Sequence, residues 1–132
     1  MTLIDTNVLL DLITDDPNWA SWSLAQLDAA ALRGPLMIND LIFAELSARF
    51  TSIEGLEAML SEMVIGLRPM PRAALFLAGK AFQRYRAAGG TRAGVLPDFL
   101  IGAQAAVSRL PLISRDASRY RTYFPTVELI AP

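Results

Sequence analysis

Five short apolar segments alternate with longer segments whose apolar residues recur at helical spacing, and this alternation limits the fold more than any other feature. The apolar segments, which predict strands, cover residues 3–5, 36–38, 64–67, 112–114 and 127–130. Strands separated by helices run parallel in one sheet, because a parallel pair needs a long crossover connection. The pattern therefore predicts an α/β fold with a mostly parallel five-stranded sheet flanked by helices.

Capping and turn residues delimit the helices between these strands. One helix is expected to begin at Asp16-Pro17, an aspartate cap with proline in the first turn, and to stop at Gly34-Pro35. In chain order, the predicted helices cover residues 7–13, 16–33, 40–50, 53–63, 71–87 and 98–109, with a short helix or turn at 116–123. In the helix that Pro71 opens, the side chains expected to face inward are Leu75, Phe76, Ala78, Phe82 and Tyr85.

The composition excludes several classes of catalytic site. The 132 residues include no cysteine and no histidine, which rules out disulfides, thiol chemistry, serine–histidine triads and ordinary zinc sites. The polar side chains that remain are carboxylates, hydroxyls, amides, arginines and a single lysine. Hard oxygen ligands of this kind favour Mg²⁺ or Mn²⁺. The length predicts one domain that spans residues 1–132 and buries a core of its own.

The distribution of charge along the N-terminal segment bears on localisation. Asp5 interrupts this segment before an apolar core typical of a signal peptide can form. The other apolar stretches are broken by charged or turn residues well short of the roughly 20 residues needed to span a bilayer. We therefore expect a soluble, cytoplasmic protein.

The two halves of the chain carry opposite charge. Residues 1–62 hold ten acidic residues against Arg33 and Arg49, a net charge of −8, whereas residues 63–132 hold ten basic residues against three acids, a net charge of +7. Eleven of the twelve basic residues are arginine, which binds phosphate through two parallel hydrogen bonds. Two interpretations remain open: the halves interleave in space and their charges average out, or they form a basic surface for an anionic polymer.

Four acidic residues stand where carboxylates are least expected. Asp5 ends the first predicted strand, and Asp116 follows the fourth in a similar context. Asp98 opens a nearly all-apolar helix, and Glu45 lies inside another apolar helix. Right-handed crossovers bring the ends of parallel strands to one edge of a sheet, where ligands bind in α/β folds. Asp5 is therefore the first candidate for a functional residue.

Each acid also has a purely structural interpretation. Asp98 and Asp116 are able to cap helices, and Glu45 is able to pair with Arg49 one turn later. Asp5 fits such a role least well, because the helix after it is short. If the four converge, like charges raise one another's pKa, and a divalent cation removes that penalty.

Five short motifs span the chain in a fixed order. They are Leu-Ile-Asp-Thr-Asn-Val-Leu-Leu-Asp at 3–11, Phe-Ala-Glu-Leu at 43–46, Tyr-Arg at 85–86 followed by Gly-Gly at 89–90, Pro-Asp-Phe-Leu-Ile-Gly-Ala at 97–103, and Ser-Arg-Asp at 114–116. Their order and spacing resemble those of PIN-domain proteins, in particular the VapC-type toxins of bacterial toxin–antitoxin pairs. The chain departs from that pattern at Ser114, where threonine is frequent, and at Phe99 and Gly102, where alanine is frequent.

The resemblance implies a PIN-like three-layer sandwich and an Mg²⁺- or Mn²⁺-dependent endoribonuclease. The residues that match the family's acidic catalytic site are Asp5, Glu45, Asp98 and Asp116. Asp5 and Asp98 match the usual direct metal ligands, with Asp116 coordinating directly or through water. Asn7 and Ser114 match polar positions that support the site. Members of the family commonly form homodimers and are inhibited by a small cognate antitoxin.

Other residues leave alternatives open. Arg84, Arg86 and Arg92 are candidates to contact RNA, with a solvated helix face as the alternative. Trp19 and Trp22 are typical of helix packing, or alternatively of a surface for an antitoxin or a second copy.

Two other classes of function are weighed against the nuclease. An α/β phosphoryl-transfer domain of the haloacid-dehalogenase kind needs a second aspartate where this chain has Asn7, and a receiver-like domain needs a late lysine, whereas the only lysine is Lys80. A non-catalytic RNA-binding domain of the same fold would need no cluster of acids.

Overall fold

A single parallel sheet forms the centre of the molecule. The computed structural model describes all 132 residues. Its strands are β1 (Thr2–Ile4), β2 (Leu36–Ile38), β3 (Ile65–Leu67), β4 (Leu112–Ile113) and β5 (Leu129–Ile130). They lie in the order β3-β2-β1-β4-β5, and every neighbouring pair is parallel. The predicted five-stranded parallel sheet is confirmed.

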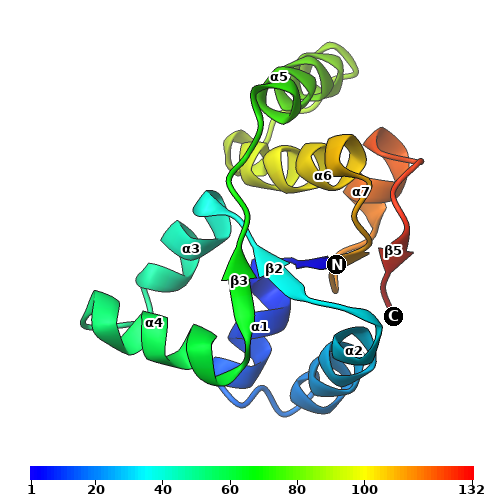
Figure 1. Cartoon of the computed structure of the whole chain (residues 1–132). Helices are drawn as coiled ribbons and strands as arrows, with labels where there is room; N and C mark the ends of the chain where they lie inside the picture. The colour runs from blue at the N-terminus through cyan, green and yellow to red at the C-terminus, as the bar shows by residue number, and fades with distance from the viewer.

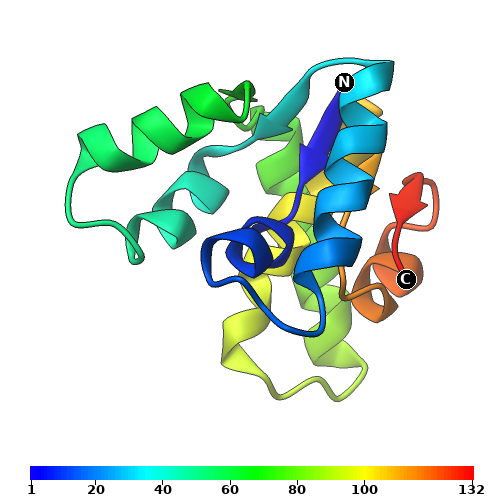
Figure 2. The same ribbon diagram turned by 90° about the horizontal axis from the view of Figure 1, so that it is seen from below.

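Seven helices surround this sheet. They are α1 (Thr6–Ile13), α2 (Ala20–Arg33), α3 (Asp40–Ser47), α4 (Ile53–Glu62), α5 (Arg72–Ala87), α6 (Leu96–Ser108) and α7 (Ser118–Tyr123), with a short 3₁₀ turn at Ala93–Val95. α5 and α6 cover one face of the sheet and α1 and α2 the other, while α3 and α4 extend from its β3 side (Figure 1, Figure 2). The arrangement is the predicted three-layer sandwich. No helix has the length and apolar character that crossing a membrane requires.

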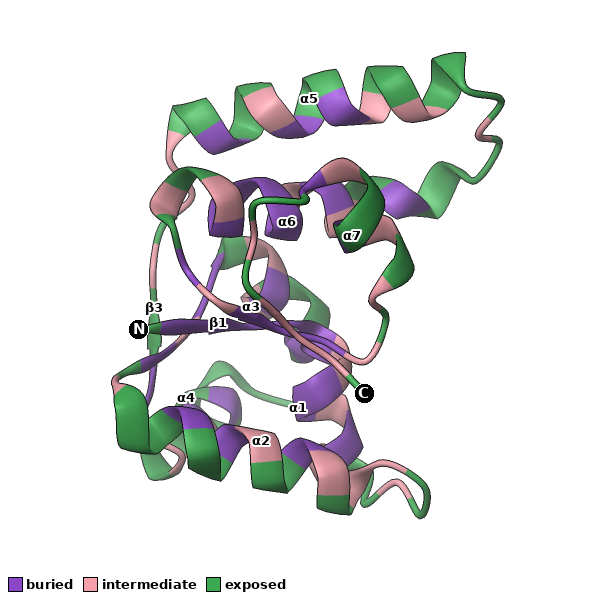
Figure 3. Cartoon of the chain, turned by 90° about the vertical axis from the view of Figure 1, so that its right-hand side faces the viewer, coloured by how far each residue is buried: buried purple, intermediate pink, exposed green.

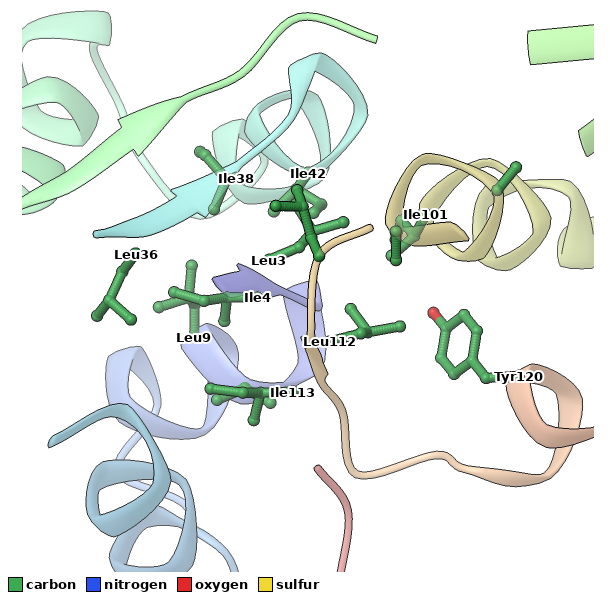
Figure 4. Packing of buried hydrophobic residues seen from close by; sticks show 14 of the residues in the cluster. Leu3, Ile4, Leu9, Leu36, Ile38, Ile42, Ile101, Leu112, Ile113 and Tyr120 are labelled. Atoms are coloured by element: carbon green, nitrogen blue, oxygen red, sulfur yellow. The ribbon is translucent and has the colours of Figure 1, made fainter. Parts of the chain in front are cut away.

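The register of the two central strands brings the ends of β1 and β4 together. Ile4 is paired with Ile113, and the backbone N–H of Asp5 donates to the carbonyl of Ile113 at 2.9 Å. The side chains of Leu3, Ile4, Leu112 and Ile113 are fully buried between the helical layers, and Figure 4 shows them in the central cluster. Burial of each such side chain stabilises the fold by about 1.5–3 kcal/mol. The residues that follow these strands are therefore held on rigid supports.

The buried face of α5 differs from the predicted one. Leu75 and Phe76, expected to face inward, are 47 % and 70 % exposed, whereas Ala78 is fully buried as predicted, together with Ala74 and Ala81. These alanines recur at helical spacing on the side of α5 that faces α6 (Figure 3). Small side chains let the two helix backbones approach closely, so the alanine stripe determines which side of α5 is buried. Phe82 and Tyr85 are partly buried against the core, as predicted.

The beginning of α2 also differs from the prediction. The helix starts at Ala20 rather than at Asp16-Pro17. The carboxylate of Asp16 accepts hydrogen bonds from the backbone N–H groups of Asn18 and Trp19 at 2.8 and 3.0 Å. Asp16 therefore closes a turn before the helix, because an aspartate carboxylate is able to cap a turn as well as a helix.

Candidate active site

Asp5 lies directly after β1 and is almost completely buried, with 5 % of its surface exposed. One of its oxygens, Oδ2, accepts hydrogen bonds from the Ser114 hydroxyl at 2.7 Å, the Tyr120 hydroxyl at 2.8 Å and the Asn7 amide at 3.4 Å. Burial raises the pKa of Asp5 above 3.8, opposed by the hydrogen bonds from Ser114 and Tyr120. None of these side-chain hydrogen bonds reaches the other carboxylate oxygen, Oδ1.

Asn7 and Ser114 join the ends of β1 and β4. The Asn7 amide donates to the Ser114 hydroxyl oxygen at 3.3 Å, and its carbonyl oxygen accepts from the backbone N–H of Arg115 at 3.2 Å. The backbone N–H of Asp116 donates to the Ser114 hydroxyl oxygen at 3.1 Å. Asn7 and Ser114, the two supporting residues expected from the sequence, therefore lie beside Asp5. Their hydrogen bonds connect the segment after β1 to the segment after β4.

Asp98 lies in the first turn of α6, where the helix dipole favours a negative charge. It forms an ion pair with Arg119 of α7. Burial and then the charge of Asp5 raise the pKa of Asp98 from 3.8 to about 6, against the opposing effect of Arg119. The structure therefore brings Asp98 into electrostatic contact with Asp5, although 93 residues separate them in the chain.

Asp116 is exposed near the same carboxylates. Its charge raises the pKa of both Asp5 and Asp98. The alternative role as a helix cap is absent, because the N-cap of α7 is Ala117 and receives no side-chain hydrogen bond. Its carboxylate accepts only a long bond from the Ser118 hydroxyl, at 3.4 Å. Three of the four predicted acids thus influence one another.

Glu45 joins the site through a different element. It lies on α3 with its side chain exposed, and its Oε1 accepts a hydrogen bond from the Thr6 hydroxyl at 2.7 Å. Thr6 follows Asp5 directly in the chain. No ion pair forms between Glu45 and Arg49, so that structural alternative is absent. Glu45 is tied to the segment that carries Asp5 but does not contribute to the raised pKa of the other acids.

The donor set fits a hard divalent cation in its chemistry. Every candidate ligand is a carboxylate oxygen, and the charges of Asp5 and Asp116 add to the effect of burial in raising the pKa of Asp98. In the present arrangement, however, no three acidic side chains lie close enough to hold one ion together. A cation bound by Asp5 and Asp98, with water completing its shell, agrees with the preference of Mg²⁺ for few direct protein ligands.

Tyr120 and Arg119, which belong to none of the predicted motifs, contact Asp5 and Asp98. Tyr120 is 2 % exposed and donates to Asp5, and burial raises its pKa well above 10, so the phenol stays protonated. Arg119, its neighbour on α7, pairs with Asp98. No motif marked either residue, because their contacts with Asp5 and Asp98 depend on how α7 packs against α6.

Arg115, which lies between Ser114 and Asp116, forms a second ion pair. Arg115 pairs with the buried Asp11 through two hydrogen bonds of 2.7 and 2.8 Å, and its guanidinium lies 5.2 Å from the centre of the Trp19 ring. Asp11 also accepts from the hydroxyl of Ser23 at 2.6 Å. Trp19, which precedes α2, packs edge to face on Trp22, and Trp22 packs against the core.

The three arginines expected to contact RNA are exposed but do not touch the acids. Arg84 and Arg86 lie over the rings of Tyr123 and Phe82 at 5.7 and 5.6 Å, in the last turn of α5. The backbone N–H of Arg92 donates to the Tyr85 hydroxyl at 3.2 Å, in the segment that leads into α6. These residues therefore lie at the end of α5 and in the connection between α5 and α6.

Comparisons with known proteins agree with this architecture. A sequence model of the PIN domain matches residues 2–125. Similar solved structures include VapBC2 from Rickettsia felis bound to a promoter DNA fragment, at 17% identity and a TM-score of 0.75, covering 99% of this chain and 98% of that chain. VapBC-1 from nontypeable Haemophilus influenzae has 15% identity and a TM-score of 0.72, covering 98% and 96%. FitAcB from Neisseria gonorrhoeae has 21% identity and a TM-score of 0.69, covering 98% and 96%. No curated protein sequence matches the chain significantly.

Proposed function

The chain belongs to the PIN-domain family, and from this premise we propose that it is an Mg²⁺- or Mn²⁺-dependent endoribonuclease and the toxin of a toxin–antitoxin pair. The observation that carries the proposal is the placement of Asp5 after β1, Asp116 after β4 and Asp98 at the start of α6, where burial and neighbouring negative charge raise the pKa of Asp5 and Asp98. Such a group calls for a cation, and the chain has no histidine to perform acid–base chemistry in its place.

Each acid has a proposed role in the reaction. Asp5 and Asp98 hold the metal ion, and Asp116 assists directly or through water. When bound, the ion supplies an activated water and neutralises charge on the phosphate. Asp5 is oriented by the three donors on its Oδ2, and Glu45, held by Thr6, orients the attacking water or completes the metal's shell. Attack by water leaves a 5′-phosphate and a 3′-hydroxyl.

Two partners belong to the proposal. The similar solved structures include VapBC complexes and a protein described as a toxin–antitoxin complex from Klebsiella pneumoniae, which supports a small cognate antitoxin for this chain. We propose cytoplasmic RNA as the substrate and a homodimer as the working form. Arg84, Arg86 and Arg92, exposed beside the start of α6, are the proposed RNA contacts.

Cleavage of total bacterial RNA tests the activity. Purified, antitoxin-free protein is incubated with Mg²⁺, with Mn²⁺ and with EDTA, beside an Asp5→Asn variant. Asparagine keeps the size of the side chain and one oxygen for the Ser114 and Tyr120 donors. Discrete fragments that disappear with EDTA and fall at least about 100-fold in the variant are expected, because one proposed ligand is lost.

The controls separate the alternatives. An Asp40→Asn variant removes an exposed carboxylate from the start of α3 and should leave cleavage unchanged. Activity that persists in EDTA would contradict the metal mechanism. A folded protein that binds RNA without cleaving it would favour the non-catalytic RNA-binding domain.

A further inference from the structure

The short helix α7 places two consecutive side chains on two different acids. Tyr120 donates to Asp5 at 2.8 Å, and Arg119 pairs with Asp98. The two side chains differ in how firmly they are held. The ring of Tyr120 is buried in the core, beside the residues shown in Figure 4, whereas Arg119 has a long, rotatable side chain that retains 17 % exposure. Tyr120 thus anchors α7 to the core, and the side chain of Arg119 reaches the carboxylate of Asp98.

Arg119 is the one basic side chain that forms an ion pair with a proposed catalytic acid. The chain has eleven arginines, but only two ion pairs form, and the other joins Arg115 to Asp11. Asp5 and Asp116 both repel a negative charge on Asp98, and the guanidinium of Arg119 is the group that offsets this repulsion. Arg119 therefore supplies, from within the chain, positive charge at the carboxylate where the proposed metal ion would bind.

We propose that Arg119 is an internal counter-ion that holds Asp98 while the metal ion is absent and competes with the ion for that carboxylate. The proposal rests on the proposed function, because it takes Asp98 as a metal ligand. A guanidinium and a divalent cation repel each other at close range, so binding of the ion drives the Arg119 side chain away from Asp98. The backbone of α7 need not move, since Tyr120 keeps the helix on the core.

The consequence is a weaker affinity for metal than the carboxylates alone would give. The ion must break the Arg119–Asp98 pair before it gains full contact with Asp98. Arg119 is accordingly a positioning residue whose removal should tighten metal binding, the opposite of what loss of a stabilising contact in the site would do.

Calorimetric titration of the full chain with Mn²⁺ tests this without RNA. At pH 8, where Asp98 is ionised, the Arg119→Gln variant should bind Mn²⁺ roughly threefold or more tightly than the wild type, as expected when a partly buried ion pair no longer competes. Arg121→Gln is the matched control, because Arg121 lies exposed on the same helix and has no ion pair. Arg119→Lys keeps the positive charge but lacks the planar guanidinium group. Its affinity for Mn²⁺ should lie between those of the wild type and Arg119→Gln.

The outcomes separate this inference from the proposed function. Unchanged or weaker Mn²⁺ binding by a folded Arg119→Gln variant, with normal binding by the wild type, would overturn the role of Arg119 and leave the metal site standing. Absence of binding by the wild type and by every Arg119 variant would overturn both. Thermal denaturation with and without Mn²⁺ provides a second readout, since a tighter ligand raises the midpoint further.

Discussion

At the scale of the residue, the site combines buried carboxylates with donors that fix their orientation. Asp5 shares one oxygen among Ser114, Tyr120 and Asn7. Burial raises the pKa of Asp5, and the hydrogen bonds to its charged form oppose that rise. Asp98 is paired with Arg119, which opposes the rise in its pKa, but burial and the charge of Asp5 still raise that pKa to about 6.

The raised pKa of Asp98 predicts how stability depends on pH in the absence of metal. The folded state binds a proton near pH 6 that the unfolded chain binds only near 3.8. The contribution of Asp98 to the free energy of unfolding is therefore most favourable below the unfolded pKa and declines as the pH rises through about 6. Urea unfolding in EDTA, from pH 4 to 7.5, should show a decline for the wild type that is smaller in Asp98→Asn. If the free energy of unfolding depended on pH in the same way for both proteins, the raised pKa of Asp98 would be contradicted.

At the scale of the element, close packing between helices explains why small residues stand at certain positions of α5 and α6, which the local sequence pattern does not explain. Gly102 of α6 lies directly under the ring of Phe124, and a Cβ at this position would also meet Tyr120 at 3.0 Å. A methyl group at this position would overlap the ring of Phe124, so the packing favours glycine. The alanine stripe of α5 has the same cause on the other side of α6, where Ala74, Ala78 and Ala81 are fully buried.

Two glycine substitutions should therefore have opposite effects. Gly102→Ala should lower the free energy of unfolding by about 1–3 kcal/mol, since the buried Phe124 ring must shift. Gly79→Ala, in the middle of α5, should raise it by about 0.5–1 kcal/mol, because nothing lies within 4 Å of the added methyl group and alanine favours a helix. Chemical denaturation of both variants checks the pair. Equal effects would show that helix propensity alone controls both sites.

The Asp11–Arg115 ion pair connects α1 to the segment after β4. Arg115→Ala should cost on the order of 3 kcal/mol, because the carboxylate of Asp11, 2 % exposed, loses its partner. Replacing both residues, as Asp11→Leu with Arg115→Leu, should cost less than removing Arg115 alone. Arg121→Ala serves as the exposed control. Denaturation curves that show additive losses for the two positions would rule out a coupled pair.

At the scale of the whole molecule, both halves of the chain contribute residues to the candidate site. Asp5 and Glu45 come from the acidic half, whereas Arg84, Arg86 and Arg92 come from the basic half and lie beside the start of α6. We propose that these acids bind a metal ion and that the exposed arginines bind a polyanion.

Removal of these arginines should weaken RNA binding uniformly. In an Asp5→Asn background, the triple variant Arg84→Gln, Arg86→Gln and Arg92→Gln should bind RNA at least about tenfold more weakly at moderate salt. The dependence of log K on log salt should also become shallower by up to about 0.7 per lost phosphate contact. Fluorescence anisotropy across a salt series measures both. Arg33→Gln with Arg49→Gln, from the acidic half, is the control, and an equal loss in the control would refute a specific role.

The sequence alone determined the parallel α/β architecture, the approximate helices and the identity of the acids. These follow from local signals: short apolar runs, caps such as Asn39, whose side chain does accept from Ile42 at 2.9 Å, and carboxylates at strand ends. Only the tertiary structure decided which side of α5 is buried, where Arg119 and Tyr120 lie, and why Gly102 is glycine. The reason is that these depend on contacts between distant segments, such as Tyr120 with Asp5, and local periodicity did not single out the alanine face of α5 among its apolar faces.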